Sequence, residues 1–206
     1  MFRDVVTSED ALRALVGTPS DLALKKQIGA LDAHCQAFIA HAPFVLVATA
    51  DAAGHCDVSP KGDAPGFVRV LDERHLAIPD RPGNKRLDGM RNILTNPHVG
   101  LIFLIPGRRE TLRVNGRACI TSDGALLASM EAQGKRPLLA IGVEVEEVFL
   151  HCAKAFIRSS LWQPDRWPPV ERLATAAQMF WDQAKPACTV EELARHIDEG
   201  YAKRLY

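Results

Sequence analysis

The chain has 206 residues and a mass of 22.6 kDa, and its 47% hydrophobic and 24% charged residues are typical of a folded globular protein. Its 25 basic and 25 acidic residues cancel, so the basic excess expected of a nucleic-acid-binding protein is missing. The longest apolar run, 99–106, is much shorter than the roughly 20 residues that span a bilayer. With five scattered cysteines and no Cys-x-x-Cys pair, these features predict a cytoplasmic protein without nucleic-acid or membrane partners and without a cysteine-based zinc site.

The first part of the chain is predicted to be helical. Thr7 and Asp10 resemble a capping box before apolar residues at helical spacing. Ser20 is predicted to cap a second helix to about residue 30, and Asp32 a third that ends at about residue 40. We therefore expect an N-terminal helical segment over residues 1–41.

From residue 44 the pattern favours β-strands, most of them joined as hairpins by turn residues such as 51–54. Shorter helices are expected at about 85–94 and after Asp123, and residues 60–66 are predicted to form a loop. This order predicts a mainly β, α+β domain over residues 42–165, built as a six- to seven-stranded antiparallel barrel with flanking helices. Residues 166–206 are predicted to form a C-terminal helical extension. The predicted strands are 44–50, 55–59, 68–71, 75–78, 99–105, 111–121 and 138–150.

The segment after the fourth predicted strand has the strongest potential for binding. The sequence contains no Gly-x-Gly-x-x-Gly, P-loop, Gly-x-Ser-x-Gly or paired-histidine metal motif. Residues 78–88 instead combine Arg81, Lys85 and Arg86 with a predicted helix start, where free N–H groups favour a phosphate. The alternative is that these cations are only solvated.

Three further segments also carry cations. Lys61 follows a predicted strand and stands either near a ligand or in a surface turn. Period two places Thr111 and Arg113 on one strand face, either solvated or lining a polar cleft. A helix here would carry three residues at a spacing of four on one face: Lys154, Arg158 and Trp162. These side chains could stack on and charge-pair with a planar ligand. Alternatively, the tryptophan lies in the core or an interface and the two cations are solvated.

Four blocks in this order resemble the pyridoxamine 5′-phosphate oxidase-like FMN-binding family, and within it a branch of FMN-dependent enzymes of undefined substrate. The blocks are Ser-Pro-Lys-Gly-Asp, Ile-Pro-Asp-Arg-Pro-Gly-Asn-Lys-Arg, Leu-Arg-Val-Asn-Gly-Arg-Ala and His-Cys-Ala-Lys-Ala-Phe-Ile-Arg-Ser-Ser-Leu-Trp. The resemblance covers about residues 35–165. It implies a split β-barrel, a homodimer and FMN in a groove at the dimer interface.

The resemblance also implies which residues contact the cofactor. Lys85 and Arg86 match the basic pair on the FMN phosphate, and Pro79 and Asp80 match a strand end on the flavin. Thr111 stands where the true oxidases have a glutamine on the ring. In those oxidases a tryptophan–arginine ending contacts pyridoxamine phosphate. Here helices replace that ending, so the resemblance does not imply vitamin B6 oxidation, and the expected substrate is a small molecule that the sequence does not define. The full set of expected FMN contacts is Lys61, Pro79, Asp80, Arg81, Asn84, Lys85, Arg86, Thr111, Arg113, Lys154, Arg158 and Trp162. The last three are candidates to come from the other subunit.

The function expected from this resemblance is an FMN-dependent oxidoreductase that transfers hydride at flavin N5, with NADH or NADPH as a possible electron donor. A cation such as Arg113 or Lys61 near N1 and O2 would favour the reduced flavin. The alternatives are a non-catalytic flavin- or haem-binding module, a deazaflavin-dependent reductase, and an interaction protein that has lost its cofactor. The intact Lys85-Arg86 pair argues against the last.

Overall fold

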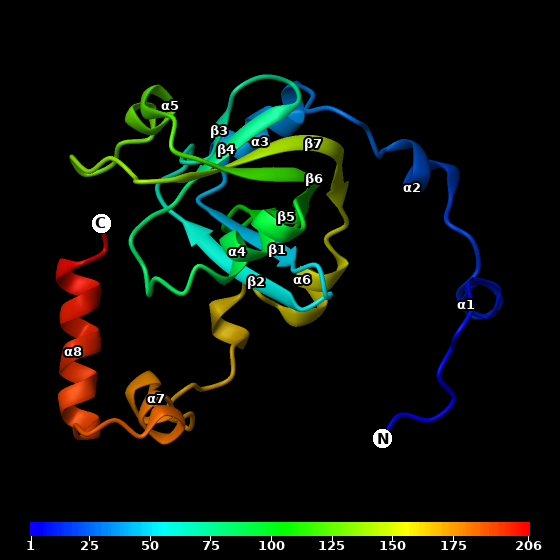
Figure 1. The fold of residues 1–206 in the computed structure, drawn as a ribbon. Coiled ribbons are helices and arrows are strands. Elements are labelled where there is room, and N and C mark those ends of the chain that lie inside the picture. Colours follow the sequence, from blue (N-terminus) through cyan, green and yellow to red (C-terminus); the bar gives the residue numbers. More distant parts are fainter.

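The computed structural model describes residues 1–206 and is built around one seven-stranded antiparallel sheet (Figure 1). The strand order is β2-β1-β5-β6-β7-β4-β3. The two edge strands, β2 and β3, do not pair with each other, so the sheet is an open, split barrel, as the sequence predicts. The strands are β1 (Phe44–Ala50), β2 (Cys56–Gly62), β3 (Arg69–Val70), β4 (His75–Pro79), β5 (His98–Leu104), β6 (Thr111–Thr121) and β7 (Ala140–His151).

The core lies inside the curve of this sheet and contains 23 buried residues. Alternate residues of β1, β5, β6 and β7 point inward, and the largest fully buried side chain is Phe103 of β5. A bulge between Asn115 and Gly116 interrupts the long β6–β7 ribbon. Bulges bend strands and increase their twist, which favours a curved sheet over a flat one.

Helices cover parts of the sheet and the ends of the core. Helix α3 (Ala33–His41) begins at its predicted cap Asp32 and adds Phe38 and Ile39 to the core. Helix α4 (Asp88–Thr95) packs on β1, β2 and β6. Its buried Asn92 donates hydrogen bonds to Thr49 of β1 and Asp57 of β2, which fixes α4 against both strands. Helix α5 (Gly124–Ser129) is capped by Asp123, as predicted.

The first strand and the 111–121 strand match the predicted bounds, whereas β2 is longer than predicted. It continues through Pro60 and Lys61 to Gly62, a stretch that the sequence assigns to a loop. Proline is tolerated because β2 is an edge strand, where a missing N–H costs no ladder bond on the open side.

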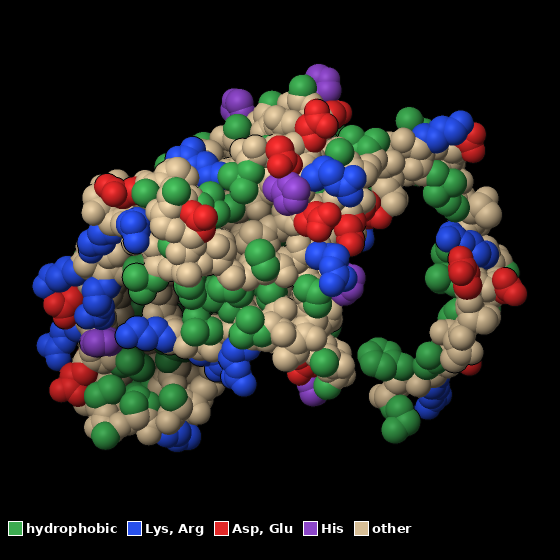
Figure 2. All heavy atoms as spheres, turned by 45° about the horizontal axis from the view of Figure 1, so that its top comes forward, with side chains coloured by type: hydrophobic (Ala, Val, Ile, Leu, Met, Phe, Trp, Pro, Cys, Tyr) green, Lys and Arg blue, Asp and Glu red, His purple; other side chains and the backbone are tan.

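The N-terminal segment leaves the barrel as an extended arm (Figure 1). Helices α1 (Glu9–Val16) and α2 (Asp21–Lys25) bury no residue, and Figure 2 shows the arm standing apart from the body. The predicted capping box at Thr7 is wrong, because Ser8 accepts the N-terminal hydrogen bond of α1. The second helix starts after Ser20 as predicted but ends earlier, at Lys25.

The C-terminal segment contains the expected helical pair. Helices α7 (Ala176–Ala184) and α8 (Val190–Lys203) pack against each other, and a capping box at Thr189 begins α8. They follow α6 (Lys154–Ser159) and a short 3₁₀ turn, η1 (Pro164–Arg166). None of the helices is both long and apolar enough to span a membrane.

Candidate functional site

The end of β2 and the start of α4 face each other across a small cavity of about 130 Å³. Alternation along β2 turns Ser59 and Lys61 inward, where both line this cavity. The first turn of α4 forms the opposite wall with Gly89 and Met90. Two elements far apart in the sequence thus place a hydroxyl, an ammonium and a helix N-terminus around one space.

Helix α4 begins at Asp88 and not at about residue 85, so the prediction that Lys85 and Arg86 form its first turn is wrong. Lys85 has a φ of 62° and Leu87 a φ of 60°, which are left-handed values that no α-helix accommodates. Both cations therefore lie in the loop that precedes the helix. No side chain caps the N-terminus of α4, so its first N–H groups remain available to an acceptor in the cavity.

The two cations of the basic pair line different cavities. Arg86 lines the 130 Å³ cavity and donates from Nε to Oδ2 of Asp88 at 2.8 Å. This hydrogen bond raises the pKa of Arg86. Lys85 lines a second cavity, of about 490 Å³, with Lys135 and Arg136. Arg86 is therefore the member of the pair that faces the uncapped helix.

Lys61 and Asp80 form an ion pair of 2.8 Å beside this site, which joins the end of β2 to the loop after β4. The neighbouring Arg81 donates to Asp63 at 2.7 Å. Burial alone would raise the pKa of Asp63, but hydrogen bonds from Tyr206, the Ala64 N–H and Arg81 outweigh it and lower that pKa. Lys61, Pro79 and Arg81 line a third cavity, of about 380 Å³.

Five of the predicted contacts lie elsewhere, at the opposite end of the β6–β7 ribbon. Pro79 pairs with Ala140 at the start of β7, whereas Thr111 pairs with His151 at its end. Arg113, also at that end, lies 5.3 Å from the ring centroid of Phe149. Burial, followed by the charges of Arg113 and Lys26, lowers the pKa of His151. The predicted residues thus form two separate groups within one chain.

The predicted single helix face of Lys154, Arg158 and Trp162 is wrong. Helix α6 ends at Ser159, and Ser160 has a left-handed φ of 52° that turns the chain away. Trp162 lies beyond the helix, where its Nε1 donates to the main-chain oxygen of Arg108 at 2.7 Å. Its indole also packs against Phe156, with 5.6 Å between ring centroids.

Several site residues have no clear signal in the sequence. Ser59 lies within the predicted strand 55–59 but is not among the predicted contacts. Asp63 and Tyr206 meet across 143 residues of sequence. The alternation of β2 could have indicated Ser59, whereas no local pattern predicts the contact of Tyr206.

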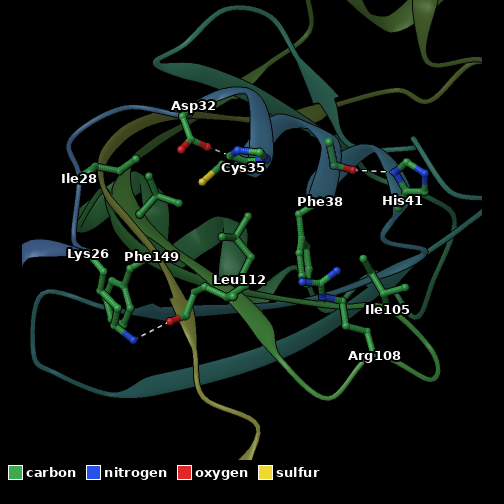
Figure 3. Close-up of a pocket in the computed structure, with 14 residues that line it drawn as sticks. Lys26, Ile28, Asp32, Cys35, Phe38, His41, Ile105, Arg108, Leu112 and Phe149 are labelled. Atoms are coloured by element: carbon green, nitrogen blue, oxygen red, sulfur yellow. Dashed lines mark hydrogen bonds between the residues drawn. The ribbon is translucent and has the colours of Figure 1, made fainter. Parts of the chain in front are cut away.

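The largest cavity, of about 670 Å³, lies away from these groups between α3, β6 and β7 (Figure 3). Phe38 and Leu112 extend into it, and the Arg108 guanidinium lies 5.3 Å from the Phe38 ring centroid. Lys26 lies at its edge and donates to the main-chain oxygen of Leu150 at 2.6 Å. None of the predicted cofactor contacts lines this mostly apolar cavity.

Cys35, which also lines this cavity, is expected to resist alkylation. Burial, with a contribution from Asp32, raises the pKa of its thiol to about 11. The thiolate is the reactive form, so at pH 8 iodoacetamide should leave Cys35 unmodified while it labels the exposed Cys56, Cys119 and Cys152. Peptide mass spectrometry would measure this, with labelling in urea as the control in which all five cysteines react. Labelling of native Cys35 as fast as Cys152 would contradict the expectation.

An open antiparallel sheet with a cation-rich loop after β4 defines the class of split-barrel proteins. The family model for pyridoxamine 5′-phosphate oxidase matches residues 31–152. The chain therefore belongs to the pyridoxamine 5′-phosphate oxidase-like family, whose members commonly bind FMN. No curated protein matches the chain.

Solved structures with the same fold include HupZ of Group A Streptococcus, at 24% identity and a TM-score of 0.47, over 58% of this chain and 92% of that one. A putative pyridoxamine 5′-phosphate oxidase of Lactobacillus delbrueckii has 24% identity and a TM-score of 0.45, over 59% and 99%. An FMN-binding protein of Syntrophomonas wolfei has 8% identity and a TM-score of 0.43, over 69% and 96%.

Proposed function

We propose that this protein is an FMN-dependent oxidoreductase acting on an undefined small molecule. The observation that carries the proposal is the uncapped N-terminus of α4, which opens on a cavity lined by Ser59, Lys61 and Arg86. Free helix N–H groups, a hydroxyl and the Arg86 guanidinium fit a phosphate monoester, the terminal group of FMN. FMN bound there would supply hydride transfer at N5.

Under this proposal the residues of the chain bind and orient the cofactor. Arg86 and the first turn of α4 would hold the phosphate, with Arg86 donating to it in place of Asp88. The Lys61–Asp80 pair and Pro79, which lies in the cavity beside Lys61, would lie toward the flavin ring. A cation at Lys61 near the ring would stabilise the negative charge of reduced flavin. No side chain is assigned as a general acid or base.

We also propose that the working unit is a homodimer with a shared site. Pro79 and Thr111 lie at opposite ends of β7, which are 11 residues apart between Ala140 and His151. At roughly 3.3 Å per residue, about 35 Å of strand separates them. One cofactor that contacts both groups would therefore take Thr111, Arg113 and the α6 region from a second copy. Light scattering should give twice the chain mass of 22.6 kDa.

The absorption spectrum of the purified protein, before and after incubation with FMN and desalting, tests the cofactor assignment. We expect flavin bands that are released as FMN on denaturation. Bleaching of these bands by NADH or NADPH under anaerobic conditions, with turnover once an acceptor is added, would support an enzyme. A Soret band, or a spectrum without flavin bands after incubation with FMN, would overturn the proposal.

A further inference from the structure

The side chain of Tyr206 is held beside the candidate flavin site, close to the loop after β4. Its hydroxyl donates to Oδ1 of Asp63 at 2.6 Å, while Arg81 Nε donates to Oδ2 of the same carboxylate at 2.7 Å. The Asp63 side chain is only 4% exposed, so this carboxylate is shielded from competing water. The Arg81 guanidinium also lies 5.7 Å from the centroid of the Tyr206 ring.

A second anchor holds the backbone of the same residue. Lys135 Nζ donates to the main-chain oxygen of Tyr206 at 2.6 Å. Leu205, the preceding residue, lines the 380 Å³ cavity with Tyr206. We call Leu205–Tyr206 the strap. It is tied to the end of β2, to the loop after β4 and to the segment before β7.

Tyr206 of the strap lines two of the cavities around this loop. The 380 Å³ cavity contains Lys61 and Pro79, which the proposed function places at the flavin ring. The 490 Å³ cavity contains Asn84 and Lys85. Tyr206 lines both, together with the loop residues Arg81, Pro82 and Gly83. Loss of the Tyr206 side chain would therefore enlarge both spaces, including the one that the proposed function places at the flavin ring.

We propose that Tyr206 is a specificity-determining residue of this site, which restricts access to the flavin ring to small reactants. The proposal rests on the proposed function. The phenol fills space that a bulky reactant would need, and its bond to the shielded Asp63 keeps it in place. A reactant of one small ring can approach beside it, whereas a fused ring system meets the phenol.

Quinones of two sizes, which each accept two electrons and two protons from reduced FMN, test this proposal. Wild-type protein, Tyr206→Ala, Tyr206→Phe and the control Tyr201→Ala, at an exposed tyrosine of α8, are loaded with FMN, photoreduced without oxygen and mixed with 1,4-benzoquinone or menadione. We expect Tyr206→Ala to react about tenfold faster with menadione and within about twofold of wild type with benzoquinone. Tyr206→Phe, which keeps the ring, should fall between, and Tyr201→Ala should match wild type.

Equal menadione rates in Tyr206→Ala and wild type would overturn the proposal, as would an equal gain with both quinones. Hydrogen–deuterium exchange of the ligand-free protein gives a readout that does not need FMN. The N–H of Asp80 donates to Leu139 at 2.9 Å, and we expect exchange across residues 79–84 to rise in Tyr206→Ala. Failure of wild-type protein to bind FMN would overturn the proposed function. Unchanged exchange would separately show that Tyr206 does not hold the loop.

Discussion

Arg86→Ala is expected to weaken FMN binding by about 10- to 100-fold. Arg86 lines the cavity at the uncapped start of α4, where it would donate to the phosphate. A hydrogen bond to a charged group contributes roughly 1.5–3 kcal/mol, and about 1.4 kcal/mol corresponds to tenfold in affinity. Lys85→Ala should have a smaller effect, because Lys85 lines the 490 Å³ cavity and not the one at the start of α4. Quenching of FMN fluorescence on binding would measure both affinities.

Two controls separate loss of a phosphate contact from a general loss of positive charge. Arg91→Ala removes an exposed cation from the same helix, and FMN affinity should stay close to that of wild type. Riboflavin lacks the phosphate, so its weaker binding should not respond to Arg86→Ala. An Arg86→Ala variant that binds FMN as tightly as wild type would contradict the assignment of the phosphate to this cavity.

Gly116→Ala is expected to destabilise the barrel strongly. Gly116 lies at the bulge of the β6–β7 ribbon, where a Cβ atom would overlap the main-chain oxygen of Glu144. The contact is with backbone, so no side-chain rotation relieves it. Overpacking of this kind costs about 3 kcal/mol or more, out of a stability of roughly 5–15 kcal/mol for a typical domain. The urea midpoint of unfolding, followed by circular dichroism, would measure the loss.

Gly124→Ala is the matched control for this change. Gly124 is the first residue of α5, and nothing lies within 4 Å of a Cβ atom built there. Alanine has a higher helix propensity than glycine, so the free energy of unfolding of Gly124→Ala should equal that of wild type or exceed it by up to about 1 kcal/mol. A Gly116→Ala protein as stable as the Gly124→Ala protein would show that the ribbon can shift at the bulge.

Local patterns predicted much of the barrel because they depend on near neighbours in the chain. The apolar, β-branched run at 44–50 and the alternation at 111–121 appear as β1 and β6 with the predicted bounds. Asp32 caps α3 because its side chain reaches the N–H of Cys35, three residues on. The cation-rich loop at 81–86 was also identified from the sequence, and it is next to the candidate site.

Predictions failed where the deciding contact comes from elsewhere in the fold or from a single backbone angle. Thr7 and Ser8 are both good caps, and composition alone does not choose between them. The start of α4 is delayed by left-handed angles at Lys85 and Leu87, residues that rarely adopt them. The α6 region turns at Ser160, which removes Trp162 from the helix face that its spacing suggests.

The sequence by itself determined the class of fold, the family and the cation-rich loop, because strand alternation, turns and motif order are local properties. Tertiary structure decided which groups share a cavity. It placed Arg86 with Ser59 and Lys61, separated Thr111 from Pro79 along β7, and brought Tyr206 onto Asp63. Each of these contacts joins segments that are distant in the sequence and meet only when the chain packs around one core. Local sequence patterns do not specify such contacts.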